Sequence, residues 1–159
     1  MSVKTMLSEC LLFFDVNSSG LEKIASITQQ KEFDAGTTLF SAGDSAVDLF
    51  VIEEGRVAIQ MSLPKMAGHV ARRITVDVVS KNEIVGWSAI VEPFKFSFNT
   101  ICMQHTKVLS INAAKLRDML NDDPALGYDI MKNLTKILAV GLNDTRQILI
   151  AERLMQSQE

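Results

Sequence analysis

Cysteine and basic charge are both scarce in this chain. It has two cysteines, Cys10 and Cys102, among 159 residues, which is too few for a disulfide scaffold or a four-thiolate metal cluster. This content is typical of a reduced, cytoplasmic protein. The formal net charge is −3, so the chain as a whole has no basic footprint for nucleic acid.

Histidine clusters and catalytic motifs are also missing. The two histidines, His69 and His105, form no H-x-H pattern and no Cys/His cluster, which a metal or haem sensor would show. No nucleophile elbow, P-loop or pair of catalytic carboxylates stands out. We therefore expect no metal, no cofactor and no enzymatic activity, and keep a haem or metal sensor only as a third alternative.

The chain has no long hydrophobic run. The apolar stretch MLSECLLFF near the N-terminus is interrupted by Glu9 and followed by Asp15. It is far shorter than the roughly 20 residues that span a bilayer, and no small-residue cleavage site follows it. We interpret it as an amphipathic helix and expect no membrane partner.

The composition and the pattern of residues along the chain favour one globular domain in three parts. Hydrophobic residues make up 47% and charged residues 22%, so the chain can bury a core. Residues 1–30 are predicted to be helical in two pieces, separated by DVNSSG, where Asn17 supplies N-cap chemistry. Residues 31–112 alternate short apolar runs with turn residues, as in a sandwich or barrel. Residues 113–159 return to the helical period, with a long helix predicted from Pro124.

Glycines mark the predicted turns between strands in residues 31–112. The runs KEFDAG and TTLFSAGD are predicted strands, and Gly36 and Gly43 lie seven residues apart near their ends. The segment LFVIEEGRVAIQ is predicted to be a hairpin, because apolar residues alternate on both sides of Gly55, which permits the positive φ of a tight turn.

Taken together, these segments resemble a known family. The order is a helix, F-x-x-G-x-x-L-F-x-x-G-D, L-F-V-I-E-E-G-x-V-x-I, I-V-G-W and a long terminal helix. It resembles the cyclic nucleotide-binding domain of bacterial regulators of the catabolite-activator type, from about Leu12 to about Ile150. The resemblance implies a mainly β fold: an eight-stranded, double-stranded β-roll related to the jelly roll, with short N-terminal helices. It also implies a long C-terminal helix that pairs in a homodimer, and a role in signal transduction.

The stretch IVGWSAIVEPFKFSF at residues 84–98 falls where this family carries its phosphate-binding cassette. In the family, a Gly-Glu pair opens a short helix, and an Arg followed by a small hydroxyl residue closes the cassette. A cyclic phosphate needs such a cation and helix N-terminal N–H donors, and the Glu accepts from the ribose. Here Gly86 and Ser97 match, but Trp87 stands at the Glu position and Phe96 at the Arg position.

These departures decide the expected ligand chemistry. Losing both charged partners removes on the order of 3 to 6 kcal/mol, or about 10² to 10⁴ in affinity. We therefore expect that cyclic AMP and cyclic GMP do not bind by the usual chemistry. Three cations remain possible anion contacts: Lys95, Arg72 and Arg73.

The sequence leaves two alternatives for what fills the predicted ligand pocket. The residues that would line this ligand pocket are Gly86, Trp87, Ser88, Ala89, Phe96, Ser97 and Phe98. Large aromatic side chains can fold inward and fill the pocket as ordinary core, since each buries about 150 to 250 Å². Alternatively, a small apolar ligand lies between the rings, oriented by Ser88 and Ser97.

The terminal helix carries two apolar stripes. It is predicted to run about 29 residues from Pro124, or roughly 43 Å. The stripe expected at a homodimer contact contains Met131, Leu134, Leu138 and Leu142, and a second stripe contains Ile130, Ile137 and Ile148. Two stripes suggest two contacts, one with the protein's own roll and one with a partner helix. A single wide stripe that packs only inward is the alternative. Only LMQSQE follows, so no direct DNA binding by this chain is expected.

The sequence thus predicts a stand-alone, dimeric regulatory or scaffold module of this fold, located in the cytoplasm. A genuine cyclic nucleotide sensor, or the sensor part of a transcription regulator, is the alternative.

Overall fold

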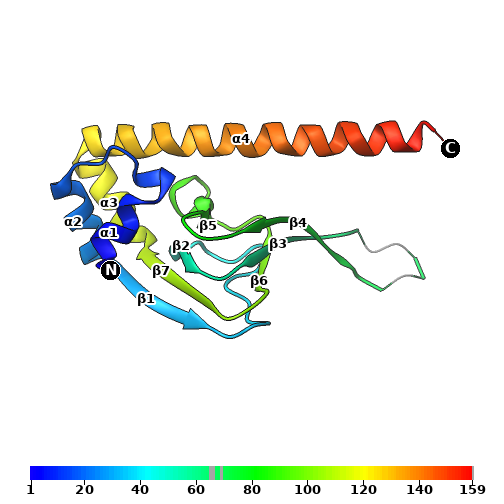
Figure 1. Cartoon of the computed structure of the whole chain (residues 1–159), viewed down its shortest axis with the longest axis horizontal. Helices are drawn as coiled ribbons and strands as arrows, with labels where there is room; N and C mark the ends of the chain where they lie inside the picture. Colours follow the sequence, from blue (N-terminus) through cyan, green and yellow to red (C-terminus); the bar gives the residue numbers. More distant parts are fainter. Residues whose placement is uncertain (65–66, 69, 159) are drawn as a thin grey trace.

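The computed structural model describes residues 1–64, 67–68 and 70–158. A β-roll carries three short helices and α3 at one end, and a long helix, α4, runs along one side of the molecule (Figure 1). This arrangement confirms the predicted fold class. His69 lies outside the described residues. Across the described residues, no helix is both long enough and apolar enough to span a bilayer.

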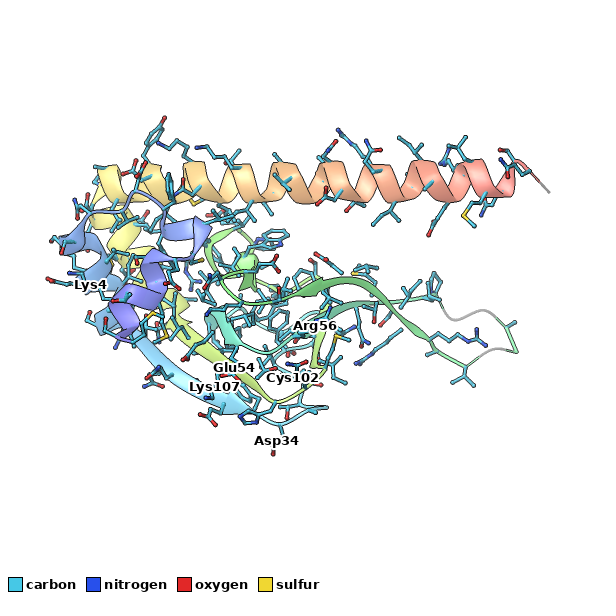
Figure 2. All side chains as sticks on the ribbon, in the orientation of Figure 1. Lys4, Asp34, Glu54, Arg56, Cys102 and Lys107 are labelled. Carbon is cyan, nitrogen blue, oxygen red and sulfur yellow. The ribbon has the colours of Figure 1, made fainter. Side chains whose placement is uncertain are left out.

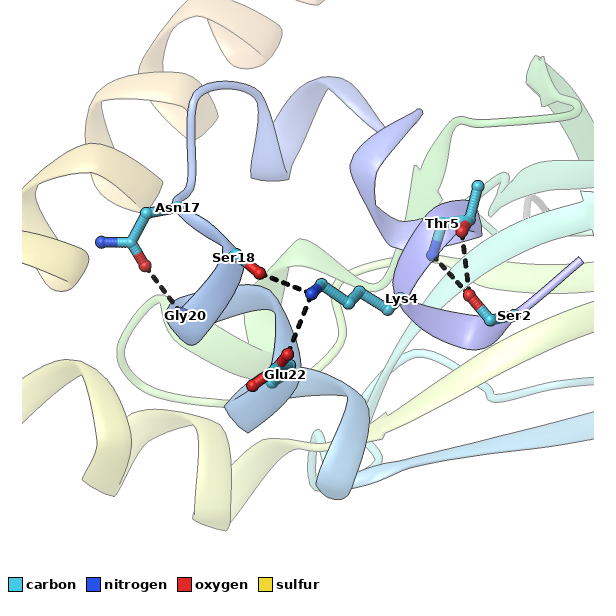
Figure 3. A network of polar contacts seen from close by, with 7 residues as sticks. All are labelled: Ser2, Lys4, Thr5, Asn17, Ser18, Gly20 and Glu22. Carbon is cyan, nitrogen blue, oxygen red and sulfur yellow. Dashed lines mark hydrogen bonds and ion pairs between the residues drawn. The ribbon is translucent and has the colours of Figure 1, made fainter.

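Three short helices, rather than the two predicted, form the N-terminal part. They are α1 Val3–Ser8, the 3-10 helix η1 Leu11–Phe13 and α2 Ser18–Ser26. Asn17 is the N-cap of α2, as predicted, and its side-chain oxygen accepts from the Gly20 N–H at 2.8 Å. Lys4 joins α1 to α2, because its ammonium donates to Ser18 at 2.5 Å and to Glu22 at 3.0 Å (Figure 3).

Seven antiparallel strands form two sheets in the described part of the chain. The sheet orders are β1-β7-β2-β5 and β4-β3-β6. The strands are β1 Thr28–Phe33, β2 Asp48–Glu54, β3 Val57–Ser62, β4 Arg73–Val79, β5 Ile84–Val85, β6 Asn99–Cys102 and β7 Thr106–Asn112. Strand structure therefore begins at Thr28, inside the range that the sequence predicts to be helical.

One predicted strand is not a strand in the structure. Residues 37–44 form an irregular segment beside β6, held there by bonds such as that from the Thr100 N–H to the Phe40 carbonyl at 3.1 Å. Gly36 and Gly43 turn the chain near its two ends with φ of 87° and 91°. The described residues therefore form seven strands rather than the eight that the resemblance implies, and the segment at residues 37–44 is the predicted strand that is not formed. An apolar run in the sequence does not distinguish a strand from an extended loop.

The segment predicted to be a hairpin is not one in the structure: Gly55 turns the chain between β2 and β3, but these strands belong to different sheets and do not pair. The φ of Gly55 is 107°, and a Cβ at this position would lie 2.6 Å from the Thr106 hydroxyl. The turn therefore needs glycine both for its backbone conformation and for its close contact with β7.

Two helices complete the chain, α3 Ala113–Asp122 and α4 Pro124–Gln156. α4 has 33 residues, four more than predicted. Its first half is anchored in the protein: the amide of Asn133 donates to the carbonyl oxygens of Leu12 at 3.1 Å and Phe14 at 2.9 Å. From residue 139 to residue 158 every side chain is exposed, and this half of α4 extends away from the helical end of the molecule (Figure 1).

The burial of α4 changes the prediction for its contact stripe. Leu134 is 2% exposed and belongs to the chain's own core, so it is not available to a partner helix. Met131 and Leu142 are exposed, and Leu138 is half-buried against the core. The sequence pattern does not reveal this burial, because Leu134 lies at the edge of the first stripe that is next to the second. From the sequence it can face either the protein's own roll or a partner helix.

Candidate functional site

In the cassette segment a glycine opens a short helix, which is the arrangement that the family resemblance implies. β5 ends at Val85, Gly86 turns the chain with φ of 90°, and the 3-10 helix η2 spans Trp87–Ile90. A loop then returns to β6 at Asn99. η2 is a single turn, so its position depends on contacts with the rest of the protein rather than on its own helical bonds.

Gly86 is required by space as well as by conformation. A Cβ there would lie 3.0 Å from the Phe96 ring and 3.3 Å from the Phe40 ring. A side chain at this position would therefore press directly on the aromatic rings inside the cassette, in a backbone conformation that L-residues rarely adopt.

Four phenylalanines, here called the Phe cluster, fill the space behind η2: Phe40, Phe50, Phe96 and Phe98. The rings of Phe40 and Phe96 are stacked, with centroids 3.6 Å apart and an angle of 12° between their planes. Phe98 and Phe50 flank Phe40, with centroids 5.6 Å and 6.3 Å away. Phe40, Phe50 and Phe96 are each buried, and Phe98 is half-buried. The position assigned to the family's Arg is thus occupied by a ring in close aromatic contact.

Two polar side chains of β6 hold the irregular segment that presents Phe40. The Asn99 side-chain oxygen accepts from the Ala42 N–H at 3.0 Å. The Thr100 hydroxyl accepts from the Phe40 N–H and donates to the Phe40 carbonyl, both at 3.1 Å. These buried side chains supply hydrogen bonds to backbone groups of the irregular segment that are not part of a β-ladder, and they fix Phe40 against the cassette.

The remaining predicted pocket residues divide into buried and exposed groups. Ser88 and Ala89 are buried and Trp87 is half-buried against the core, whereas Ser97 is exposed. Ser97 therefore does not face the same interior as Phe96, consistent with the alternation of neighbours in an extended segment.

The three cations proposed as anion contacts are not gathered at the Phe cluster. Lys95 is exposed and forms an isolated bridge with Ser45. Arg72 and Arg73 are exposed on the β3–β4 hairpin, which extends away from η2 (Figure 1). Arg73 is paired with Ser62 of β3, at the end of β4 farthest along the strand from Val79.

Charged pairs lie instead at an outer edge of the roll. Figure 2 shows Glu54 and Lys107 near Asp34, on the side of the roll away from α4. The ammonium of Lys107 lies 3.4 Å from Glu54, and this hydrogen bond raises the pKa of Lys107. Such exposed pairs are screened by solvent and define no ligand site.

The candidate metal-ligating and nucleophilic groups of the described residues are His105 and the two cysteine thiols. His105 contacts Glu32 at 3.2 Å and Asp34 at 3.5 Å, but no group of three potential ligands occurs in the described part of the chain. Cys10 is buried, and burial raises the pKa of its thiol to about 11. Burial also raises the pKa of Cys102. Both thiols are therefore poor nucleophiles.

Two hollows of the surface lie away from the cassette. One of about 400 Å³ is open and lies between α2 and α3, with Lys23, Asp118 and Asp122 on its walls. Another of about 150 Å³ is bordered by Gln29, Asp48 and other polar residues near the start of β1. Neither of these two hollows is lined by the Phe cluster.

Sequence reasoning missed Phe40, Phe50 and Arg117. Phe40 and Phe50 lie in predicted strands, where an apolar residue is ordinarily read as core. Arg117 lies on α3, and its guanidinium donates to the Ala89 carbonyl at 2.7 Å. Nothing in the local pattern around Arg117 indicates a contact with a segment 28 residues earlier.

Comparisons with known proteins agree with the overall fold. A family model described as the cyclic nucleotide-binding domain matches residues 30–123. The anaerobic regulatory protein of Bacillus subtilis (strain 168) is 27% identical over 138 residues, which are 86% of this chain and 56% of that protein. The chain thus spans about half the length of this curated relative.

Two solved structures extend the comparison. A protein of Geobacter metallireducens assigned as cyclic nucleotide-binding is 26% identical, with a TM-score of 0.73 over 87% of this chain and 97% of that chain. The catabolite activator protein of Thermus thermophilus is 18% identical, with a TM-score of 0.65 over 87% of this chain and 61% of that chain. The second likeness is one of fold.

Proposed function

The chain belongs to the cyclic nucleotide-binding domain family, and we propose that it is a regulatory module whose cassette is filled by its own aromatic side chains instead of a nucleotide. One observation carries this proposal: Phe96 is stacked on Phe40, with ring centroids 3.6 Å apart. The resemblance to the family assigns the phosphate-binding Arg to the position of Phe96. An anion there would meet apolar rings, and burying an anion without a cation costs several kcal/mol.

Calorimetric titration with cyclic AMP and cyclic GMP tests the proposal. We expect dissociation constants weaker than about 100 μM for both nucleotides, because Trp87 and Phe96 provide neither a carboxylate nor a guanidinium. Lys95→Ala should leave any residual binding unchanged, since Lys95 is exposed. A dissociation constant in the low micromolar range for either nucleotide would contradict the proposal.

Native mass spectrometry separates the self-filled cassette from one that retains a small apolar ligand. We expect the mass of the polypeptide alone, because the Phe40 and Phe96 rings leave no gap between them. A reproducible added mass that is lost on denaturation would show that a ligand occupies the cassette region.

We further propose that the module is a homodimer through the second half of α4. Leu142 is 52% exposed and lies beyond the part of α4 that packs on its own subunit. Exposed apolar side chains on a long helix are typical of a contact with a partner helix.

Light scattering on purified protein checks the dimer. We expect a dimer at tens of micromolar and a folded monomer for Leu142→Asp, because a charge in an apolar seam stays unpaired. Asn143→Asp is the matched control, since it places the same charge one residue further along the same exposed helix. A monomeric wild type would overturn the proposal.

A second candidate function is the sensor part of a transcription regulator. The similarity to the anaerobic regulatory protein of Bacillus subtilis favours it, because this chain corresponds to 56% of that protein. Under this reading the same self-filled cassette and α4 would serve a longer polypeptide. Measuring DNA binding by the protein as it occurs in cells, after determining its intact mass, distinguishes this candidate from the stand-alone module.

A further inference from the structure

Arg117 connects the cassette to α3 by two different contacts. One guanidinium nitrogen donates to the carbonyl of Ala89 in η2 at 2.7 Å. The guanidinium carbon also lies 4.2 Å from the centroid of the Phe94 ring, in the loop that follows η2. A single half-buried side chain thus holds both the helix of the cassette and its return loop.

Each of these two contacts meets a local need of the cassette. The carbonyl groups near the C-terminal end of a one-turn helix lack intrahelical donors, and a cation there also complements the helix dipole. Phe94 has φ of 58°, an uncommon conformation for an aromatic residue that must be stabilised by its surroundings. The Phe94 carbonyl accepts from the Ala46 N–H at 2.8 Å, and Arg117 covers the ring.

We propose that Arg117 is a positioning residue that fixes the cassette to α3, so that η2, the Phe94 loop and α3 move as one body. The inference rests on the proposed function only in taking the cassette as the regulatory element. The cation comes from outside the cassette, from a helix that leads within one residue, Asp123, into α4. A displacement of η2 is therefore transmitted to the base of α4, and a displacement of α3 to the cassette.

Hydrogen exchange and fluorescence can measure this connection without any ligand. Trp87 is the single tryptophan and the first residue of η2, so its fluorescence reports on the cassette alone. In Arg117→Ala we expect roughly tenfold faster exchange of the η2 amides, corresponding to the loss of one charge-assisted hydrogen bond. Quenching of Trp87 by acrylamide should increase, while the β2–β7 ladder keeps its protection. Lys115→Ala, an exposed cation on the same helix, should change neither signal.

The proposed coupling between η2 and α3 is tested by a double-mutant cycle that combines Arg117→Ala with Gly86→Ala. A Cβ at Gly86 presses on the Phe96 ring, so this substitution disturbs the cassette from inside. We expect Gly86→Ala to speed amide exchange in both η2 and α3, and to affect only η2 when Arg117 is also alanine. A merely stabilising role for Arg117 would give additive effects instead.

Two further variants keep the inference open to refutation if Arg117→Ala is poorly folded. Arg117→Lys should restore part of the η2 protection, and Phe94→Leu should weaken it while keeping the bond to Ala89. An equal response of α3 to Gly86→Ala with and without Arg117 or Phe94 would overturn the proposal. Because no nucleotide is used, a failure here is distinct from the discovery of nucleotide binding, which would overturn the proposed function alone.

Discussion

Replacing Phe96 with alanine tests whether the cassette is part of the core. Phe96 is 4% exposed, and its ring centroid lies 3.6 Å from that of Phe40. Truncation therefore removes a packed ring and leaves a cavity beside Phe40. Phe-to-Ala changes in protein cores cost about 3 to 5 kcal/mol. In a domain of this size, that loss lowers the melting temperature by roughly 6 to 20 °C.

Urea and thermal denaturation followed by circular dichroism measure this loss. Phe14→Ala is the matched control: the same substitution at a ring that is 57% exposed should cost less than about 1 kcal/mol. The cavity also predicts a rescue, because a dry apolar cavity binds small aromatic molecules. Benzene or indole should raise the melting temperature of Phe96→Ala but not that of the wild type. A loss no larger than that of Phe14→Ala would refute the reasoning.

Three other predictions concern single residues. Gly86→Ala should destabilise the protein by about 1 to 3 kcal/mol, because its φ is 90°; an unchanged denaturation midpoint would contradict this. Asn133→Ala should cost about 2 to 4 kcal/mol in urea denaturation, since two η1-region carbonyls lose their donor, whereas exposed Asn143→Ala should be nearly neutral. Burial raises the pKa of the Cys10 thiol from 9.0 to about 11, so the folded state favours the neutral form. The associated stability, about 2 to 3 kcal/mol, is present below pH 9 and lost as the pH rises through 11; Cys10→Ala should flatten this loss.

Local signals in the sequence predicted much of the fold. Asn17 before a helix, Gly55 between two apolar runs and Pro124 after acidic caps each act over a few residues, and the structure places them as expected. The family resemblance supplied the connection between these elements. The segment at residues 37–44 was mispredicted because its conformation depends on Thr100, which is distant in sequence and supplies the hydrogen bonds of a missing strand partner.

The candidate site was less predictable for the same physical reason. The backbone path of the cassette follows from Gly86, and the loss of charge follows from the identity of Trp87 and Phe96. The partners of Phe96 do not follow from either. Phe40 and Arg117 reach the cassette from opposite directions along the chain, and only the packed structure shows that one meets Phe96 and the other meets Ala89. Likewise, Leu134 is consistent with either stripe of α4 until packing assigns it to the core.

The stack of Phe96 on Phe40 also limits the mutational routes by which this site could acquire a ligand. A single change of Phe96 to arginine would place a guanidinium among phenylalanine rings with no acid beside it, at a cost of several kcal/mol. A single change of Trp87 to glutamate would remove an aromatic ring that packs against the core. The new carboxylate would have no ribose hydroxyl to bind, because no cation would hold the phosphate of the nucleotide. Each step lowers stability before it yields affinity, so nucleotide recognition can arise here only when several substitutions occur together.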